Sequence, residues 1–263
     1  EAIPLVWYRM VIAGMLMFIF IKIKDISLSV SPKMLFRFSF AGIIIALHWI
    51  TFFASIKAAN ISIALAMFST GAFFASLIEP IFYKRKIIKY ELFFGLLVIV
   101  GIGLIMQTEL RYFLGIILGI SSALFSSLFA VLNGKFVTHY KASTISFYEF
   151  VSGVGFISIF LCFSSDGFSN EFFNLSTSDW GYLLILASIC TAYAFIASVH
   201  VMKYITPYSV VLTYNLEPIY GIVLALILFP ETETMSASFY TGASLIIFTL
   251  VLNALFKQKS NKI

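Results

Sequence analysis

Long, continuous apolar runs separated by short polar segments make up almost the whole chain. A helix needs about 20 apolar residues to cross the roughly 30 Å hydrocarbon core of a bilayer. Continuous runs near that length predict helices rather than the alternating strands of a membrane barrel. We therefore expect nine transmembrane helices, over residues 4–21, 38–56, 61–83, 90–106, 112–132, 143–163, 180–202, 207–229 and 237–256.

The composition supports an all-α membrane protein. Of the 263 residues, 61% are hydrophobic and 11% are charged, whereas a soluble domain carries about 25% charged residues. So few charges could not cover the surface of a soluble enzyme. The net charge of +5 is modest, so we expect no nucleic-acid partner. Cys162 and Cys190 lie inside apolar runs, and we expect them to be small buried hydrophobic residues.

The basic residues of the loops predict how the chain is oriented. One set of alternate loops holds fourteen Lys and Arg residues, and the opposite set holds only Lys57 and Arg111. By the positive-inside rule the first set is cytoplasmic, which places the C-terminus in the cytoplasm and Glu1 outside. A chain that begins outside at a glutamate also leads us to expect one further helix before residue 1 in the full-length protein.

The sequence contains a weak internal repeat. Residues 7–11 recur as residues 147–151 at an offset of 140, and residues 56–95 align with 202–242 at offsets of 146–147. A duplication follows, with a first repeat over 1–106 that holds four of five helices. The second repeat, over 107–263, holds five. Each repeat unit has five helices, which is an odd number, so equivalent helices of the two repeats cross the membrane in opposite directions. Many secondary transporters have this inverted arrangement.

One motif resembles a known family. Residues 215–221 read NLEPIYG and are followed by Pro230-Glu231. This pattern resembles the ninth helix of EamA-type transporters of the drug/metabolite transporter superfamily, except that Pro230 replaces the usual glycine. In the first half, Ser69-Thr70-Gly71 takes the place of the proline and Lys84 that of the terminal glutamate.

The resemblance has implications for fold and function. It implies two inverted five-helix repeats, ten helices in the family and nine here, in a multi-pass protein of the bacterial cytoplasmic (inner) membrane. It implies a secondary transporter that exports small metabolites such as amino acids. Ionisable residues at membrane depth make a proton the candidate coupling ion. The alternatives are an importer of the same fold and a non-transporting scaffold or receptor, each a monomer or a homodimer.

Motif absences agree with a transporter rather than an enzyme. The sequence has no GxxxxGK[ST] phosphate loop, no HExxH zinc motif and no GxSxG nucleophile elbow. We therefore expect no catalytic residues, no cofactor and no metal site. The expected partners are the lipid bilayer and a small-molecule substrate.

Ionisable residues at membrane depth are the leading site candidates, because each is costly to insert. Glu217 lies near the midpoint of 207–229 beside Pro218, and it is a candidate for binding a substrate ammonium group or a coupling proton. Arg9 and Glu149 occupy equivalent positions of the two repeats and suit a substrate carboxylate and an amine or proton, respectively. The alternative is that all three residues only stabilise helix packing.

Several neighbouring residues complete the candidate set. His48 could relay protons, and Trp49 could form a cavity wall, although both are equally typical of packing groups. Glu79 is expected to pair with Lys84 or Arg85. Small residues at every fourth position of one helix predict close helix packing, within the bundle or at a dimer contact. The further cavity-lining candidates are Tyr148, Tyr214 and Asn215, and the small residues are Gly115, Gly119, Ala123 and Ser127.

Overall fold

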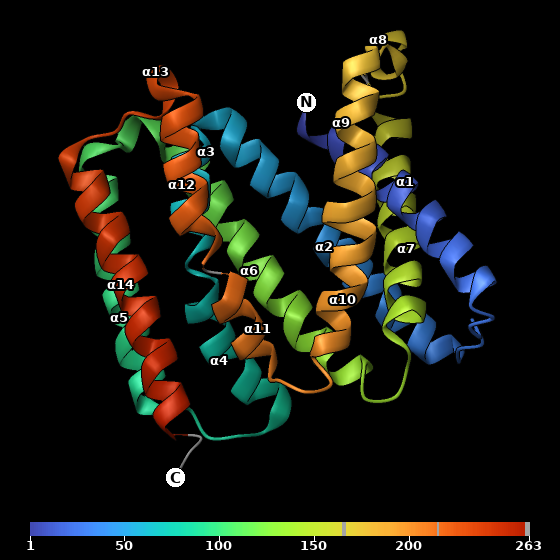
Figure 1. Cartoon of the computed structure of the whole chain (residues 1–263), viewed down its shortest axis with the longest axis horizontal. Helices are drawn as coiled ribbons and strands as arrows, with labels where there is room; N and C mark the ends of the chain where they lie inside the picture. Colours follow the sequence, from blue (N-terminus) through green and yellow to red (C-terminus); the bar gives the residue numbers. More distant parts are fainter. Residues whose placement is uncertain (165–166, 215, 261–263) are drawn as a thin grey trace. The chain divides into compact units, whose positions relative to one another are not determined.

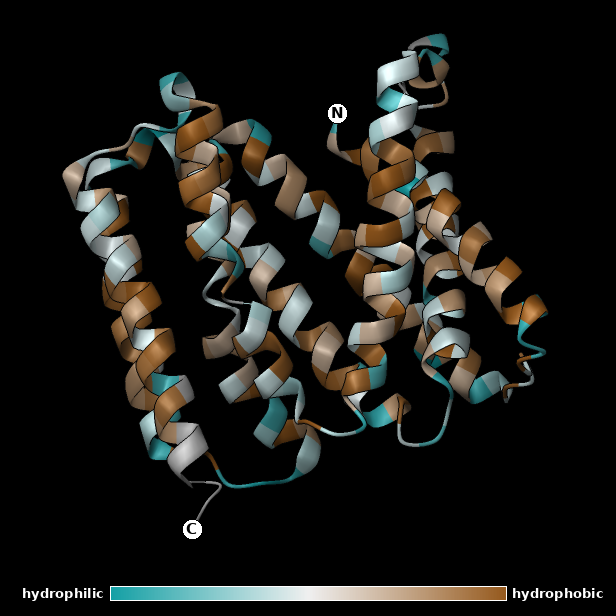
Figure 2. Cartoon of the chain, viewed as in Figure 1, coloured by the Kyte–Doolittle hydropathy of each residue, from teal (hydrophilic) through white to brown (hydrophobic). Residues whose placement is uncertain are grey.

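The computed structural model describes residues 1–164, 167–214 and 216–260. Within these ranges the protein is helical and contains no strand. Eight helical stretches of the described chain are long and apolar enough to cross a membrane, and a shorter apolar stretch follows at Ala237–Asn253. Hydrophobic residues dominate the middle of most helices, and hydrophilic ones gather at helix ends and loops (Figure 2). The chain is therefore a multi-pass membrane protein.

The described helices follow one another with short connections (Figure 1). Their bounds are α1 (Ala2–Ile23), α2 (Pro32–Ala58), α3 (Ile61–Phe68), α4 (Gly71–Tyr83), α5 (Lys89–Thr108), η1 (Leu110–Tyr112), α6 (Phe113–Phe136), α7 (Ala142–Phe163), α8 (Asn170–Phe173), α9 (Thr177–Ala187), η2 (Ser188–Tyr193), α10 (Ala194–Val201), α11 (Pro207–Tyr214), α12 (Glu217–Leu228), α13 (Pro230–Glu233) and α14 (Ala237–Ser260).

The helices group into two compact units. Unit 1 comprises Glu1–Ile50 and Leu132–Ile205, and unit 2 comprises Thr51–Val131 and Thr206–Ile263. In unit 1, α1 packs against α7. In unit 2, α5 packs against α14, α3 against α12, and α4 against α11. Each unit thus combines an early and a late part of the chain.

Two of the predicted spans, 61–83 and 207–229, correspond to the helical stretches Ile61–Tyr83 and Pro207–Leu228, and each stretch is interrupted by a tight turn that the sequence did not predict. The stretch 61–83 divides into α3 and α4 at a tight turn, where the amide of Thr70 donates to the carbonyl of Met67 (3.1 Å). The hydroxyls of Ser69 and Thr70 also donate to the carbonyls of Leu65 (3.1 Å) and Met67 (2.8 Å). Such local bonds compete with the helical ladder. The span predicted over 207–229 divides into α11 and α12, and α12 has Pro218 in its first turn. Proline has no N–H to continue a helix from the preceding residues.

Helix lengths and spacings recur along the chain. α1 and α7 each have 22 residues and begin 140 residues apart, at Ala2 and Ala142. α3 and α11 each have eight residues and begin 146 residues apart, at Ile61 and Pro207. α4 and α12 also begin 146 residues apart. These three helix starts thus recur at nearly the same offsets as the sequence repeat.

The small residues of α6 contact neighbouring helices of unit 2, as predicted. A Cβ atom on Gly115 would lie 2.5 Å from the Cβ of Ala59, and one on Gly119 would lie 2.7 Å from the Cβ of Met67. Ser127 donates a 2.8 Å hydrogen bond to the carbonyl of Gly71. The packing interpretation is therefore confirmed.

The prediction for the two cysteines is wrong. Cys162 and Cys190 are both exposed rather than buried. An exposed position on a membrane-spanning helix can still be in an apolar environment, because the bilayer surrounds it. Hydropathy alone does not distinguish a face turned to lipid from one turned to protein, since both are apolar.

Candidate functional site

Two buried carboxylates cap the short helices of unit 2. Glu233, which follows α12, accepts hydrogen bonds from the backbone amides of Ile61 (3.0 Å) and Ser62 (2.9 Å) at the start of α3. Glu79, near the end of α4, accepts one from the amide of Tyr208 (2.8 Å) at the start of α11. An anion stabilises the positive end of a helix dipole. The caps show that α3 runs antiparallel to α12, and α4 antiparallel to α11 (Figure 1).

An arginine joins two buried carboxylates at one end of unit 2. Arg85 Nε lies 3.2 Å from Glu79 Oε1, and Arg85 Nη2 lies 3.5 Å from Glu91 Oε2. The predicted pairing of Glu79 with Arg85 is confirmed. Sequence analysis did not single out Glu91, because it lies at the edge of its predicted span, where a solvated carboxylate is ordinary. The structure buries it, with 1% of its surface exposed.

Arg85→Met is expected to destabilise the protein by about 3–5 kcal/mol, because removing one member of a buried ion pair leaves charge in a poorly solvated place. The measurement is thermal unfolding in detergent. Lys86→Met, at the exposed neighbouring position, is the control and should change stability little. Adding Glu79→Gln to Arg85→Met should restore part of the loss. If Arg85→Met and Lys86→Met lowered the stability equally, the ion pairs of Arg85 would not be what stabilises the protein.

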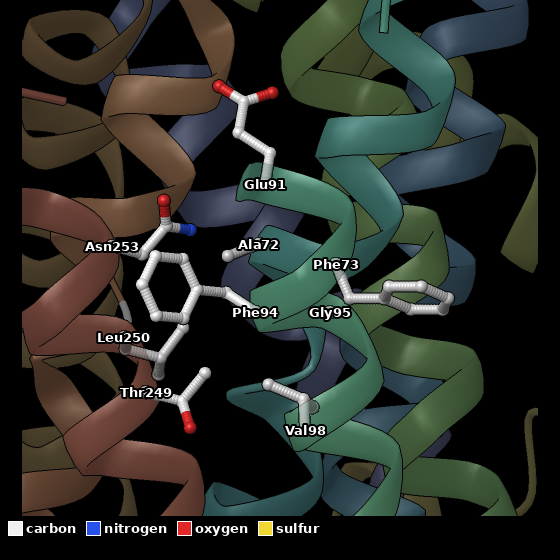
Figure 3. A pocket seen from close by; sticks show the side chains of 9 residues that line it. All are labelled: Ala72, Phe73, Glu91, Phe94, Gly95, Val98, Thr249, Leu250 and Asn253. Carbon is white, nitrogen blue, oxygen red and sulfur yellow. The ribbon is translucent and has the colours of Figure 1, made fainter. Parts of the chain in front are cut away.

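A small cavity of about 10 Å³ lies beside Glu91, between α5 and α14. In Figure 3 Phe94 and Leu250 lie next to Asn253, whereas the ring of Phe73 points away from them. Asn253 donates a hydrogen bond to the hydroxyl of Tyr208. A cavity of this size has room for about one water molecule. It is too small for a metabolite.

Unit 1 contains a buried arginine held in a defined orientation. The guanidinium carbon of Arg9 lies 4.1 Å from the ring centroid of Trp49, and its Nε donates a 2.6 Å hydrogen bond to Thr191 Oγ1. Trp49 in turn packs against Phe150 and Phe195, with ring centroids 5.5 and 5.9 Å away. A cation over an aromatic face is stabilised by the ring quadrupole. Arg9, predicted as a site residue, and Trp49 are therefore in direct contact.

A π-helical segment supplies the threonine that contacts Arg9. Thr191 belongs to η2, and its hydroxyl donates to the carbonyl of Leu186 (2.6 Å) while it accepts from Arg9. Short π segments inside α-helices occur frequently at functional sites. Sequence analysis missed Thr191. The available signal was the group of hydroxyl residues Ser188, Thr191 and Tyr193 inside one apolar run.

Glu149 lies in a separate environment of unit 1. Its side chain is fully buried, and its Oε1 accepts a 2.8 Å hydrogen bond from Asn133 Nδ2. Asn133 was missed because it lies one residue beyond the predicted span 112–132. Arg9 and Glu149, which have equivalent places in the sequence repeat, are thus held by different partners.

The remaining candidates have varied surroundings. His48 is buried beside Trp49, with ring centroids 6.4 Å apart. The hydroxyl of Tyr148 donates to the carbonyl of Leu28 (2.7 Å), a contact that stabilises the connection between α1 and α2. In unit 2, Glu217 is exposed at the first residue of α12, and Tyr214 is half-buried at the last residue of α11. Asn215 lies outside the described residues.

A larger cavity, of about 580 Å³, opens in unit 1 between α1 and α9. Ligand sites for small molecules commonly occupy about 300–1,000 Å³. Its lining is mainly apolar and includes Tyr8, Asp179, Tyr182 and Cys190. Tyr8 precedes Arg9 in the chain, and Cys190 precedes Thr191. Its lining residues thus include the chain neighbours of Arg9 and Thr191, whereas Arg9, Trp49 and Thr191 themselves do not line it.

Comparison with known proteins agrees with this architecture. The model of the EamA-like transporter family matches residues 1–107 and 113–255. A solved crystal structure superposes with a TM-score of 0.70 at 14% sequence identity, covering 98% of this chain and 88% of the other, and this likeness concerns the fold alone. No match was found among curated proteins. Since the family model covers nearly the whole chain, the protein belongs to the EamA-like transporter family.

Proposed function

We propose that the protein is a secondary transporter that exports small metabolites such as amino acids by alternating access between inverted repeats. The observation that carries this proposal is the pair of broken helices in unit 2, α3–α4 and α11–α12. Secondary transporters commonly bind substrate near the bilayer midplane at discontinuous helices, whose ends present unpaired backbone groups to the ligand. Interruptions at matching positions of the chain therefore favour a transporter over a scaffold or receptor.

The proposed repeats are residues 1–106 and 107–263. The equal offsets of α1 and α7, and of α3 and α11, support this division. The antiparallel pairs α3–α12 and α4–α11 support opposite orientations of the two repeats. The two segments matched by the family model, 1–107 and 113–255, meet at nearly the same boundary.

Arg9 is the proposed site for a substrate carboxylate. Its planar guanidinium is held by Trp49 and Thr191, and the chain neighbours Tyr8 and Cys190 line a cavity large enough for an amino acid. Arginine binds carboxylates with two parallel hydrogen bonds. In unit 2, Glu217 at the break before α12 is the proposed site for a substrate ammonium group or a proton. His48, Tyr148, Tyr214 and Asn215 remain proposed supporting residues of these sites.

The proposed location is the bacterial cytoplasmic membrane, with the C-terminus in the cytoplasm. The fourteen Lys and Arg residues of one set of loops, against two in the other, support this orientation. Labelling of single cysteines introduced at Lys86 and at Lys57 in intact cells tests it. A membrane-impermeant reagent should label position 57 and spare position 86.

Counterflow in proteoliposomes tests transport itself. Liposomes with the purified full-length protein are loaded with an equimolar mixture of the proteinogenic amino acids, and the same mixture, radiolabelled, is added outside. A carrier should accumulate label transiently by exchange, and liposomes without protein should not. If the two preparations take up label equally, the protein does not carry amino acids.

A further inference from the structure

Glu149 is the most completely enclosed carboxyl group in the described part of unit 1. None of its surface is exposed. Asn133 donates a hydrogen bond to Oε1, and Oε2 is buried without a hydrogen-bond partner among the described residues. The hydroxyl of Ser146, three residues earlier on α7, is also buried without one in the described structure. Glu149 therefore has one donor for four lone-pair positions.

The charged and titratable groups on the helices around α7 interact with other partners or lie at the surface. Arg9 of α1 lies on Trp49 and donates to Thr191. His48 of α2 lies beside Trp49. Lys135 of α6 and His200 of α10 are exposed. Within the described residues, the hydrogen bond from Asn133 is the one polar contact recorded for the Glu149 side chain.

An ionised carboxylate in such a place is very unfavourable, because the side chain is shielded from bulk solvent and no cation among the described residues pairs with it. A proton on Oε2 removes the charge without any change of fold. The packing seen here thus suits the neutral acid, and ionisation requires the surroundings of α7 to open to water.

We propose that Glu149 is a proton-exchange site, which holds one proton on Oε2 in the packed state and releases it to water when α7 separates from its neighbours. Asn133 positions the carboxyl group through Oε1. The step is a single protonation of a carboxylate by an aqueous proton, with no other bond formed or broken. The extension that this proton couples to transport rests on the proposed function.

The packing of α7 makes the site sensitive to helix movement. A Cβ on Gly42 of α2 would lie 2.2 Å from the backbone oxygen of Glu149, so the two backbones touch there. The next residue, Phe150, packs against Trp49 and Phe195, the latter at a centroid distance of 4.8 Å. Water reaches Glu149 only if these contacts loosen. Trp49 is therefore a natural reporter of the protonation state.

Fluorescence of Trp49 tests proton binding without a substrate. The chain has three tryptophans, so Trp7→Phe and Trp180→Phe in the full-length protein leave Trp49 as the sole reporter. We expect one pH-dependent transition, its loss in Glu149→Gln, and its retention in Glu231→Gln, the same change at an exposed carboxylate. A transition that survives Glu149→Gln, or none with Glu149 present, would overturn the proposal.

Infrared difference spectroscopy of the protein with its native tryptophans provides the second measurement. We expect the carbonyl band of a buried carboxylic acid to disappear as the pH rises, and to be absent from Glu149→Gln. Persistence of that band in Glu149→Gln would assign the proton to another group and overturn the proposal.

Transport assays distinguish the coupling of a proton to transport from the binding of a proton by Glu149. With the amino-acid mixture as probe, Glu149→Gln should keep counterflow within about twofold and lose accumulation driven by an imposed pH gradient by at least tenfold. Unchanged gradient-driven accumulation would overturn the coupling. Absence of counterflow in the unaltered protein would count against the proposed function, and the Trp49 titration would still decide the proton site.

Discussion

Arg9→Met is expected to reduce amino-acid counterflow by about thirtyfold or more. Truncating one partner of a buried, hydrogen-bonded charge pair costs about 2–5 kcal/mol of binding, and each 1.4 kcal/mol corresponds to a factor of about ten. Arg9 is 9% exposed and is oriented by Trp49 and Thr191. The measurement is the initial rate of exchange in proteoliposomes at matched protein density.

Two further variants separate recognition from packing. Thr191→Val removes the acceptor for Arg9 Nε and keeps the charge, so it should weaken exchange less than Arg9→Met. Arg9→Lys keeps the charge and loses the planar fork, so it should recover only part of the activity. Amines that lack a carboxylate should be insensitive to Arg9→Met. If Arg9→Met exchanges amino acids at the normal rate, Arg9 is not the carboxylate site.

Gly42→Leu is expected to prevent stable assembly of unit 1, with a cost of about 3 kcal/mol or more. A Cβ at position 42 would lie 2.2 Å from the carbonyl oxygen and 2.9 Å from the Cα of Glu149. These are backbone atoms, which cannot turn aside as a flexible side chain can. Glycine permits the close approach of two helix backbones that small-residue interfaces in membranes require. Thermal unfolding in detergent and the yield of monodisperse protein measure the effect.

Glycines with open space around them are the matched controls. No atom lies within 4 Å of a Cβ placed on Gly155, which is on α7 itself, or on Gly103 of α5. Gly155→Leu and Gly103→Leu should leave the unfolding temperature nearly unchanged. A similar loss in Gly42→Leu and Gly155→Leu would mean that helix propensity, and not the contact with Glu149, causes the effect.

Individual helices show which parts of the fold the sequence predicts and which it does not. The first apolar run predicts a helix over 4–21, and α1 covers Ala2–Ile23. The run over 61–83 predicts one span, and the stretch Ile61–Tyr83 has these bounds. Hydropathy does not reveal the turn at Ser69 and Thr70, whose hydroxyls donate to carbonyls of the preceding turn. Pro218 was a recognisable signal for the second break. The matching break at Ser69-Thr70 had no proline to reveal it.

The residues of the candidate site likewise divide into those that the sequence reveals and those that it does not. Arg9, Glu149 and Glu217 were selected because a charge inside an apolar run is visible in the sequence. Thr191 and Asn133 were missed because a hydroxyl or an amide in or beside such a run is common. Their roles depend on contacts with residues far away in the chain, 182 residues in the case of Arg9 and Thr191.

The sequence by itself determined the membrane class, the approximate helix bounds and which ionisable residues lie inside apolar runs. These properties are sums or periodicities over neighbouring residues, so they can be read locally. Only the tertiary structure decided which groups meet: Arg9 with Trp49 and Thr191, Glu149 with Asn133, and Glu233 with the start of α3. Burial makes each polar group in a membrane protein require a partner, but helix packing determines which partner lies within hydrogen-bonding distance.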